Sequence, residues 1–205
     1  MTELERDKQA AQALLQKALG RTDAAEFTRM GGLTNRTYHA VFQDGAEYVV
    51  RIPGEGTEEM ISRRDEEVST RLACKLGIDA ELLYFGENGA KVTAYIPGAV
   101  TMSAPEPQHI REAADILRRL HRSGEDTGIP FEVFSMAASY EKIIADKQVP
   151  MFSDYAEVKA EVMAAKRQID AACDIAQVPC HNDVLCENWV VSDAGKMYLI
   201  DWEYA

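Results

Sequence analysis

Residues that suit metal binding and proton transfer are concentrated near the C-terminus. The stretch from His181 through Asp183 to Asn188 is followed by two short apolar runs, which the turn Ser192–Gly195 separates, and then by Asp201. Such a pattern predicts a hairpin, and antiparallel pairing would bring the amide oxygen of Asn188 and the carboxylate of Asp201 to its open end. Oxygen ligands of this type suit Mg²⁺, which prefers one or two carboxylates together with substrate phosphates.

Asp183 lies on the loop before this hairpin, where a carboxylate is free to accept a proton from a hydroxyl group. His181 is in a position to brace the same loop by hydrogen bonding. A purely structural alternative is a loop-capping histidine and aspartate followed by a turn asparagine. Several residue types match at once, and this favours the catalytic interpretation.

The composition excludes several classes of function. The chain has 205 residues and a formal net charge of -12, which argues against an electrostatic grip on nucleic acid or on an anionic membrane. Four cysteines without a Cys-x-x-Cys spacing are typical of a reducing compartment, and neither a secretory signal nor a long apolar span is visible. We therefore expect a cytoplasmic protein with no nucleic-acid or membrane partner. The sequence leaves its oligomeric state undecided.

Apolar periodicity and turn residues predict the elements that position these groups. The linker at 97–107, rich in proline, divides the chain into an N-terminal lobe, 1–96, and a C-terminal lobe, 97–205. Helices are expected at 3–19, 57–76, 106–122, 135–147 and 153–175. Strands are expected at 27–30, 37–42, 47–52, 80–85 and 91–95, with the final hairpin between 188 and 201.

Two sequence motifs resemble those of the choline/ethanolamine kinase family, which belongs to the aminoglycoside-phosphotransferase-like kinases. They are His181-Asn-Asp-x-x-x-x-Asn188 and Ile200-Asp-Trp-Glu-Tyr-Ala205. The resemblance implies an α+β, two-lobe protein-kinase-like fold, with an antiparallel sheet plus a helix in the first lobe and a mainly helical second lobe. It also implies an ATP-dependent kinase in which Asp183, Asn188 and Asp201 are catalytic and the last two hold Mg²⁺.

The resemblance extends to residues expected to bind ATP. Those at the phosphate-covering loop and at the hinge between the lobes are Gly31, Gly32, Thr34, Asn35, Tyr95 and Ile96. Arg51 occupies the strand position where protein kinases carry a phosphate-contacting lysine, and Glu66 is the expected partner, with Glu67 as a close rival. Two alternatives stay open, an ordinary turn at Gly31 and Gly32 and a surface ion pair between Arg51 and Glu66.

The implied acceptor is a small alcohol, choline, whose ammonium group we expect near Glu203 and Tyr204. Members of the family continue beyond the position of Ala205, so we expect an acceptor site that is incomplete in this chain. Ethanolamine, an aminoglycoside or another small alcohol is an alternative acceptor. A truncated nucleotide-binding module without turnover is an alternative of a different class.

Overall fold

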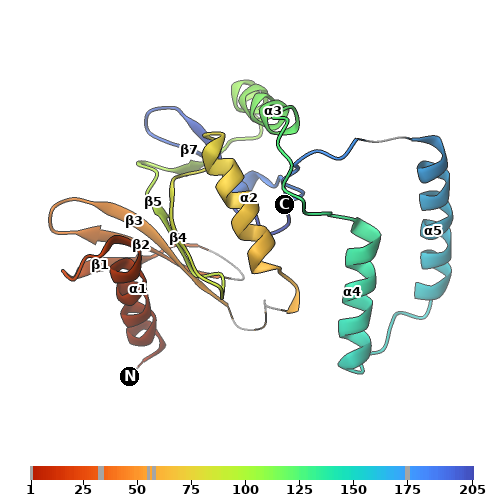
Figure 1. Ribbon diagram of the computed structural model, residues 1–205, viewed down its shortest axis with the longest axis horizontal. Coiled ribbons are helices and arrows are strands. Elements are labelled where there is room, and N and C mark those ends of the chain that lie inside the picture. The colour runs from red at the N-terminus through yellow and green to blue at the C-terminus, as the bar shows by residue number, and fades with distance from the viewer. Residues whose placement is uncertain (1, 32–34, 55, 57–58, 174–175) are drawn as a thin grey trace. The chain divides into compact units, whose positions relative to one another are not determined.

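The computed structural model describes residues 2–31, 35–54, 56, 59–173 and 176–205, and it separates into two compact units (Figure 1). One unit comprises Met1–Ile129 and Pro179–Ala205, and the other comprises Pro130–Val178. The boundary expected from the sequence, between residues 96 and 97, separates two lobes and does not coincide with the division into these units. It stays a prediction. In the described ranges, no helix has the length and apolar character needed to cross a membrane.

The first unit contains a five-stranded antiparallel sheet in the order β1-β2-β3-β5-β4. Its strands are β1 (Ala25–Arg29), β2 (Asn35–Phe42), β3 (Glu47–Pro53), β4 (Leu82–Phe85) and β5 (Lys91–Ala94). Tyr38 of β2 is paired with Val50 of β3, which is paired in turn with Val92 of β5. This register places the apolar core residues Tyr38, Val50 and Val92 on one face, and the buried Arg51, next to Val50, on the other.

Helix α1 (Glu3–Leu19) covers the buried face of the sheet (Figure 1). A capping box between Thr2 and Glu5 begins the helix, and Gly20, with a φ of 70°, ends it. Ala11 and Leu15 are fully buried against the sheet, so the expected opening helix is confirmed.

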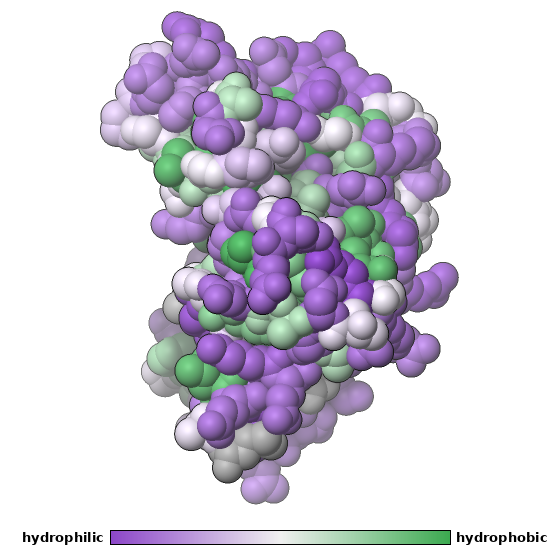
Figure 2. All heavy atoms as spheres, turned by 90° about the vertical axis from the view of Figure 1, so that its left-hand side faces the viewer, coloured by the Kyte–Doolittle hydropathy of each residue, from purple (hydrophilic) through white to green (hydrophobic). Residues whose placement is uncertain are grey.

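On the face seen in Figure 2, hydrophilic side chains predominate and the hydrophobic ones form only small separate areas.

Helix α2 (Arg63–Lys75) begins later than the expected residue 57. Ser62 is the N-cap, and its side chain accepts a hydrogen bond from the backbone of Asp65. Residues 57 and 58 lie outside the described residues. Met60, which the apolar pattern assigned to the buried face of this helix, is exposed and precedes the helix. The buried face of α2 instead carries Arg63 and Glu66, which periodicity of apolar residues does not reveal.

The expected hairpin between residues 188 and 201 forms, and it gains a third strand. Strands β7 (Trp189–Val191) and β8 (Met197–Leu199) pair with each other, and β6 (Val100–Thr101) pairs with β7. The expected linker therefore contains a strand, because residues between its prolines are free to donate and accept hydrogen bonds. Helix α3 (Pro107–His121) buries Ile116 and Leu120 in the same core as the hairpin.

The second unit contains helices α4 (Val133–Asp146) and α5 (Tyr155–Ala172). Polar contacts join the two helices, since Glu141 accepts hydrogen bonds from Tyr155 and Lys159. Every residue of both helices is described, and none of them is buried. The expected helices are thus present, but they have no core of their own.

Candidate active site

The loop that carries Asp183 is held by the neutral form of His181. The backbone N–H of Asp183 donates to His181 Nδ1 over 3.2 Å, so the other ring nitrogen, Nε2, carries the proton and donates to the carbonyl of Ile200 over 2.9 Å. Burial lowers the pKa of this imidazole, which is only 1% exposed. Asn182 has a φ of 63° and donates to the carbonyl of Tyr204, which ties the loop to the chain after the hairpin.

Asn188 is fixed by Asp183. Its carboxamide nitrogen donates to the Asp183 carbonyl over 2.8 Å and to the carboxylate oxygen Oδ2 over 3.0 Å. A carboxamide held through its nitrogen in this way directs its oxygen to the opposite side. The orientation leaves the Asn188 oxygen suited to bind a cation rather than to cap the loop.

The hairpin brings Asn188 next to Asp201, as its pairing predicts. The backbone N–H of Ile200 donates to the carbonyl of Asn188 over 2.9 Å. One candidate metal ligand, Asn188, is therefore a paired residue, and the other, Asp201, directly follows its partner Ile200. Asp201 has a φ of 68°, a left-handed conformation that aspartate tolerates better than most residues. Its side chain is 37% exposed and therefore accessible to a ligand.

The donor set fits Mg²⁺. Within the part of the chain that the structure describes, no group of three or more histidine, cysteine, aspartate or glutamate side chains is placed to hold a metal. One amide oxygen and one carboxylate leave the remaining positions for water and phosphate oxygens, which is the arrangement that Mg²⁺ accepts.

Arg51 and Glu66 form a buried ion pair. Arg51 Nη1 lies 2.5 Å from Glu66 Oε1, and the two side chains are 5% and 0% exposed, which excludes the surface ion pair considered above. The rival Glu67 instead pairs with Arg71 on the exposed side of α2. Burial alone would raise the pKa of Glu66, but the hydrogen bond and charge of Arg51, with the charge of Lys91, outweigh it and lower that pKa.

Two further cations surround Glu66 and were not found from the sequence. Arg63 Nη1 lies 2.7 Å from Glu66 Oε2, and the ammonium group of Lys91 lies 3.6 Å from Oε1. The three-residue spacing between Arg63 and Glu66 on a helix was the available signal for the first. Lys91 is placed by sheet register, opposite Arg51, and no local pattern indicates it.

The expected nucleotide-binding residues are only partly described. Gly32 and Thr34 lie outside the described residues. Gly31 is exposed, and Asn35 is a buried residue at the start of β2. Their roles toward phosphate stay predictions.

At the expected hinge, the Tyr95 ring stacks on the imidazole of His39, with 3.9 Å between ring centroids. Ile96 is 9% exposed, and its carbonyl accepts a hydrogen bond from Ala99. His39 belongs to β2, so the contact joins the hinge to the sheet, and the sequence does not reveal it. The roles of Tyr95 and Ile96 in nucleotide binding also stay predictions.

Glu203 and Tyr204 lie in the turn after Asp201. The Glu203 side chain is 7% exposed, and its Oε2 lies 3.8 Å from Arg63 Nη1. Burial, with the nearby charges of Asp201 and Glu66, raises the pKa of Glu203. Glu203 thus borders the buried charge cluster, by which we mean Arg51, Arg63, Glu66 and Lys91. The roles of Glu203 and Tyr204 toward an ammonium group stay predictions.

Comparison with known proteins identifies relatives that match most of the chain. The sequence profile of a family described as choline/ethanolamine kinase matches residues 28–205. Protein LicA of Haemophilus influenzae is 27% identical over 183 residues, which are 87% of this chain and 53% of that protein.

Two solved structures are similar over nearly the whole chain. Choline kinase LicA from Streptococcus pneumoniae has a TM-score of 0.83 and 29% identity, covering 97% of this chain and 69% of that one. A structure of LicA in complex with AMP has a TM-score of 0.81 and 28% identity, with coverages of 100% and 70%. The expected kinase-like α+β fold is confirmed. The chain spans about half the length of the curated relatives it matches.

Proposed function

Since the chain belongs to the choline/ethanolamine kinase family, we propose that it transfers the γ-phosphoryl group of ATP to the hydroxyl group of choline. The likeness to a choline kinase from Streptococcus pneumoniae supports choline as the acceptor, and the AMP-bound neighbour supports an adenine nucleotide as the donor. The family description also includes ethanolamine, which is therefore the second candidate acceptor.

One observation carries the proposal, the hydrogen-bonded group formed by Asp183, Asn188 and the backbone before Asp201. In the proposed site, Asn188 is paired with Ile200, the residue before Asp201, and Asp183 on the preceding loop is hydrogen-bonded to the Asn188 side chain. The buried Arg51 reaches the same place, with Nη1 3.8 Å from Asp201 Oδ1. Phosphoryl transfer requires chiefly positioning and charge stabilisation, and this group provides both.

In the proposed reaction the acceptor oxygen forms a bond to the γ-phosphorus as the bond to the bridging β–γ oxygen breaks. Asp183 orients the acceptor hydroxyl and takes its proton. Arg51 donates hydrogen bonds to phosphate oxygens, while residues 1–96 and 97–205 contribute from either side of the nucleotide. Asn188 and Asp201 would hold Mg²⁺, which when bound supplies charge neutralisation on the phosphate oxygens.

The test is ADP release with Mg²⁺-ATP and a panel of choline, ethanolamine and an aminoglycoside. We expect release that depends on choline and falls by about 10²- to 10⁴-fold in Asp183→Asn, because a general base contributes a factor of that size. Calorimetric binding of Mg²⁺-ATP should be retained in this variant, since Asp183 acts on the acceptor, and both the backbone carbonyl and an asparagine side-chain oxygen at this position can still accept the hydrogen bonds from Asn188.

Each other outcome would change one part of the proposal: the acceptor, the class of function or the role of Asp183. Turnover with ethanolamine alone would move the acceptor assignment to the second candidate. Nucleotide binding without turnover of any alcohol would favour the nucleotide-binding module. Full activity in Asp183→Asn would refute the proton-accepting role.

A further inference from the structure

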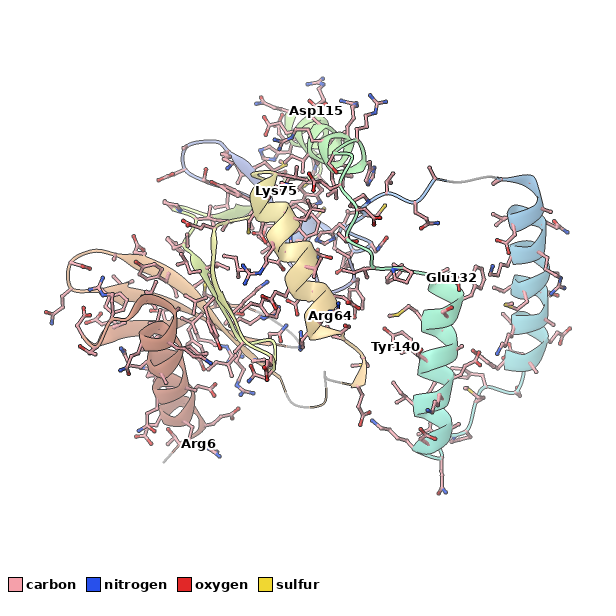
Figure 3. The ribbon with its side chains drawn as sticks, in the orientation of Figure 1. Arg6, Arg64, Lys75, Asp115, Glu132 and Tyr140 are labelled. Atoms are coloured by element: carbon pink, nitrogen blue, oxygen red, sulfur yellow. The ribbon has the colours of Figure 1, made fainter. Side chains whose placement is uncertain are left out.

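The side chain of Arg63 is buried within the charge cluster although it belongs to the first turn of α2. Its neighbour Arg64, labelled in Figure 3, is exposed and marks the solvent side of that turn. Arg63 Nη1 contacts Glu66 Oε2 over 2.7 Å, while Arg51 takes the other oxygen, Oε1. Both oxygens of one buried carboxylate are thus held by guanidinium groups, which fixes its rotation.

The β4–β5 turn touches both arginines at Gly89. The carbonyl of Gly89 accepts hydrogen bonds from Arg51 Nη2 over 2.8 Å and from Nε over 3.3 Å. On its other side, a Cβ added to Gly89 would lie 2.5 Å from Arg63 Cδ and Nε. The φ of Gly89 is +84°, so both the conformation and the close approach of Arg63 require glycine here.

Arg63 also connects α2 to the turn that carries the metal ligand. Its Nη1 lies 3.8 Å from Glu203 Oε2, two residues after Asp201, and Ser69 of the same helix donates to the carbonyl of Ala205 over 3.0 Å. The buried carboxylates of Glu66 and Glu203 therefore share one guanidinium group. Replacement of a buried ionic partner leaves its carboxylate desolvated and unpaired, which favours a rearrangement of the cluster.

We propose that Arg63 is a positioning residue for the nucleotide: together with Gly89 it holds Glu66 and Arg51 in the orientation in which Arg51 meets phosphate. The inference rests on the proposed function, because it assumes that Arg51 contacts the phosphates of ATP. Arg63 itself acts through Glu66. Its removal should weaken nucleotide binding more than it affects binding of the acceptor.

The experiment compares Arg63→Gln with Arg63→Lys and with the control Arg71→Gln. Arg71 is exposed and pairs with Glu67 on the same helix, so its substitution removes a similar ion pair away from the cluster. The readouts are the Kd of Mg²⁺-ATP, KM for ATP, KM for choline and kcat, with thermal denaturation confirming that each variant is folded.

We expect Arg63→Gln to raise the Kd and the KM for ATP by about tenfold, because Glu66 and Arg51 lose the orientation that Arg63 holds, and loss of a residue that orients a ligand-binding group has effects of this size. KM for choline should change less than KM for ATP, because Arg63 Nη1 lies 3.8 Å from Glu203 but 2.7 Å from Glu66. Arg63→Lys should recover part of the affinity, since an ammonium keeps the charge but not the planar fork. Arg71→Gln should behave like the unmodified chain.

Gly89→Ala is the second variant in case Arg63→Gln does not fold, because it displaces Arg63 while leaving every charge in place. A raised Kd for ATP in this variant supports the positioning role. A folded Arg63→Gln or Gly89→Ala variant with unchanged Kd and KM for ATP overturns it.

Failure of the proposed function gives a different result. An unmodified chain that binds Mg²⁺-ATP but phosphorylates no alcohol contradicts the kinase proposal, and the Kd comparison then still decides the role of Arg63. An unmodified chain that does not bind Mg²⁺-ATP overturns both.

Discussion

At the scale of single residues, Asp79 is a buried acid that the sequence did not single out. Burial raises its pKa to about 6, with the charge of Asp201 in the same direction, while Lys91 and hydrogen bonds from Ala80 and Trp202 act to lower it. The backbone N–H of Ala80 lies 2.6 Å from its Oδ1. Keeping such a carboxylate ionised at neutral pH therefore reduces the stability of the fold.

We predict that Asp79→Asn stabilises the protein at neutral pH. Between about pH 4 and pH 6 the folded state keeps a proton that the unfolded state loses, so the stability of the unmodified chain falls as pH rises through this window. The advantage of the variant should grow by about 3 kcal/mol over the same window and stay constant above it. Urea denaturation of both proteins from pH 4 to pH 8 measures it. A difference independent of pH would contradict the raised pKa.

Asp201 is the residue on which the metal assignment depends. We predict that Asp201→Asn lowers the Mg²⁺-dependent affinity for ATP by about tenfold or more, since even indirect supports of metal ligands have effects of 10- to 100-fold. Asparagine tolerates the left-handed backbone at this position, so the substitution tests charge rather than conformation. Calorimetric titration at several Mg²⁺ concentrations is the measurement.

The control for Asp201 is Asp193→Asn, which changes an exposed aspartate in the turn of the same hairpin. Its Mg²⁺ dependence should equal that of the unmodified chain. If Asp201→Asn retained the same dependence as well, Asp201 would not be a metal ligand.

At the scale of the elements, α1 is held by apolar packing on the sheet. Leu15 is fully buried there, whereas Leu4 of the same helix is 50% exposed. We predict that Leu15→Ala lowers the free energy of unfolding by about 2–5 kcal/mol, the usual cost of a cavity of this size. Leu4→Ala should change it by less than about 0.5 kcal/mol. Equal effects in denaturant titrations would show that α1 does not pack as described.

The strand and helix boundaries show which local signals were sufficient. Glycine at Gly20 and the Asp44-Gly45 turn predicted the end of α1 and the β2–β3 hairpin closely, because both depend on neighbouring backbone conformations. The start of α2 and the strand β6 were missed. The first depends on the Ser62 cap, and the second on a partner strand, β7, that lies far away in the sequence.

At the scale of the whole molecule, the two compact units differ in how much they bury. The first has two apolar clusters, while α4 and α5 of the second contain no buried residue. We predict that backbone amides of α4 and α5 exchange with deuterium much faster than those of α3, because few buried contacts oppose local opening. Mass-spectrometric hydrogen exchange measures this, and equal protection of α3, α4 and α5 would contradict it.

The sequence alone determined that Asn188 and Asp201 would meet, because they lie at the two ends of one hairpin whose pairing follows local rules, with Asp183 on the loop before it. Local patterns likewise predicted most of the helices and strands. The surroundings of Glu66 were decided only by the tertiary structure. Glu66 and Glu67 are neighbours in the same helical turn. Only the packing of α2 against β3 and the β4–β5 turn makes Glu66 the buried partner of Arg51 and leaves Glu67 on the exposed side, paired with Arg71. Contacts between distant segments, such as Arg51 with Gly89, depend on how the elements assemble, and no spacing within a segment encodes them.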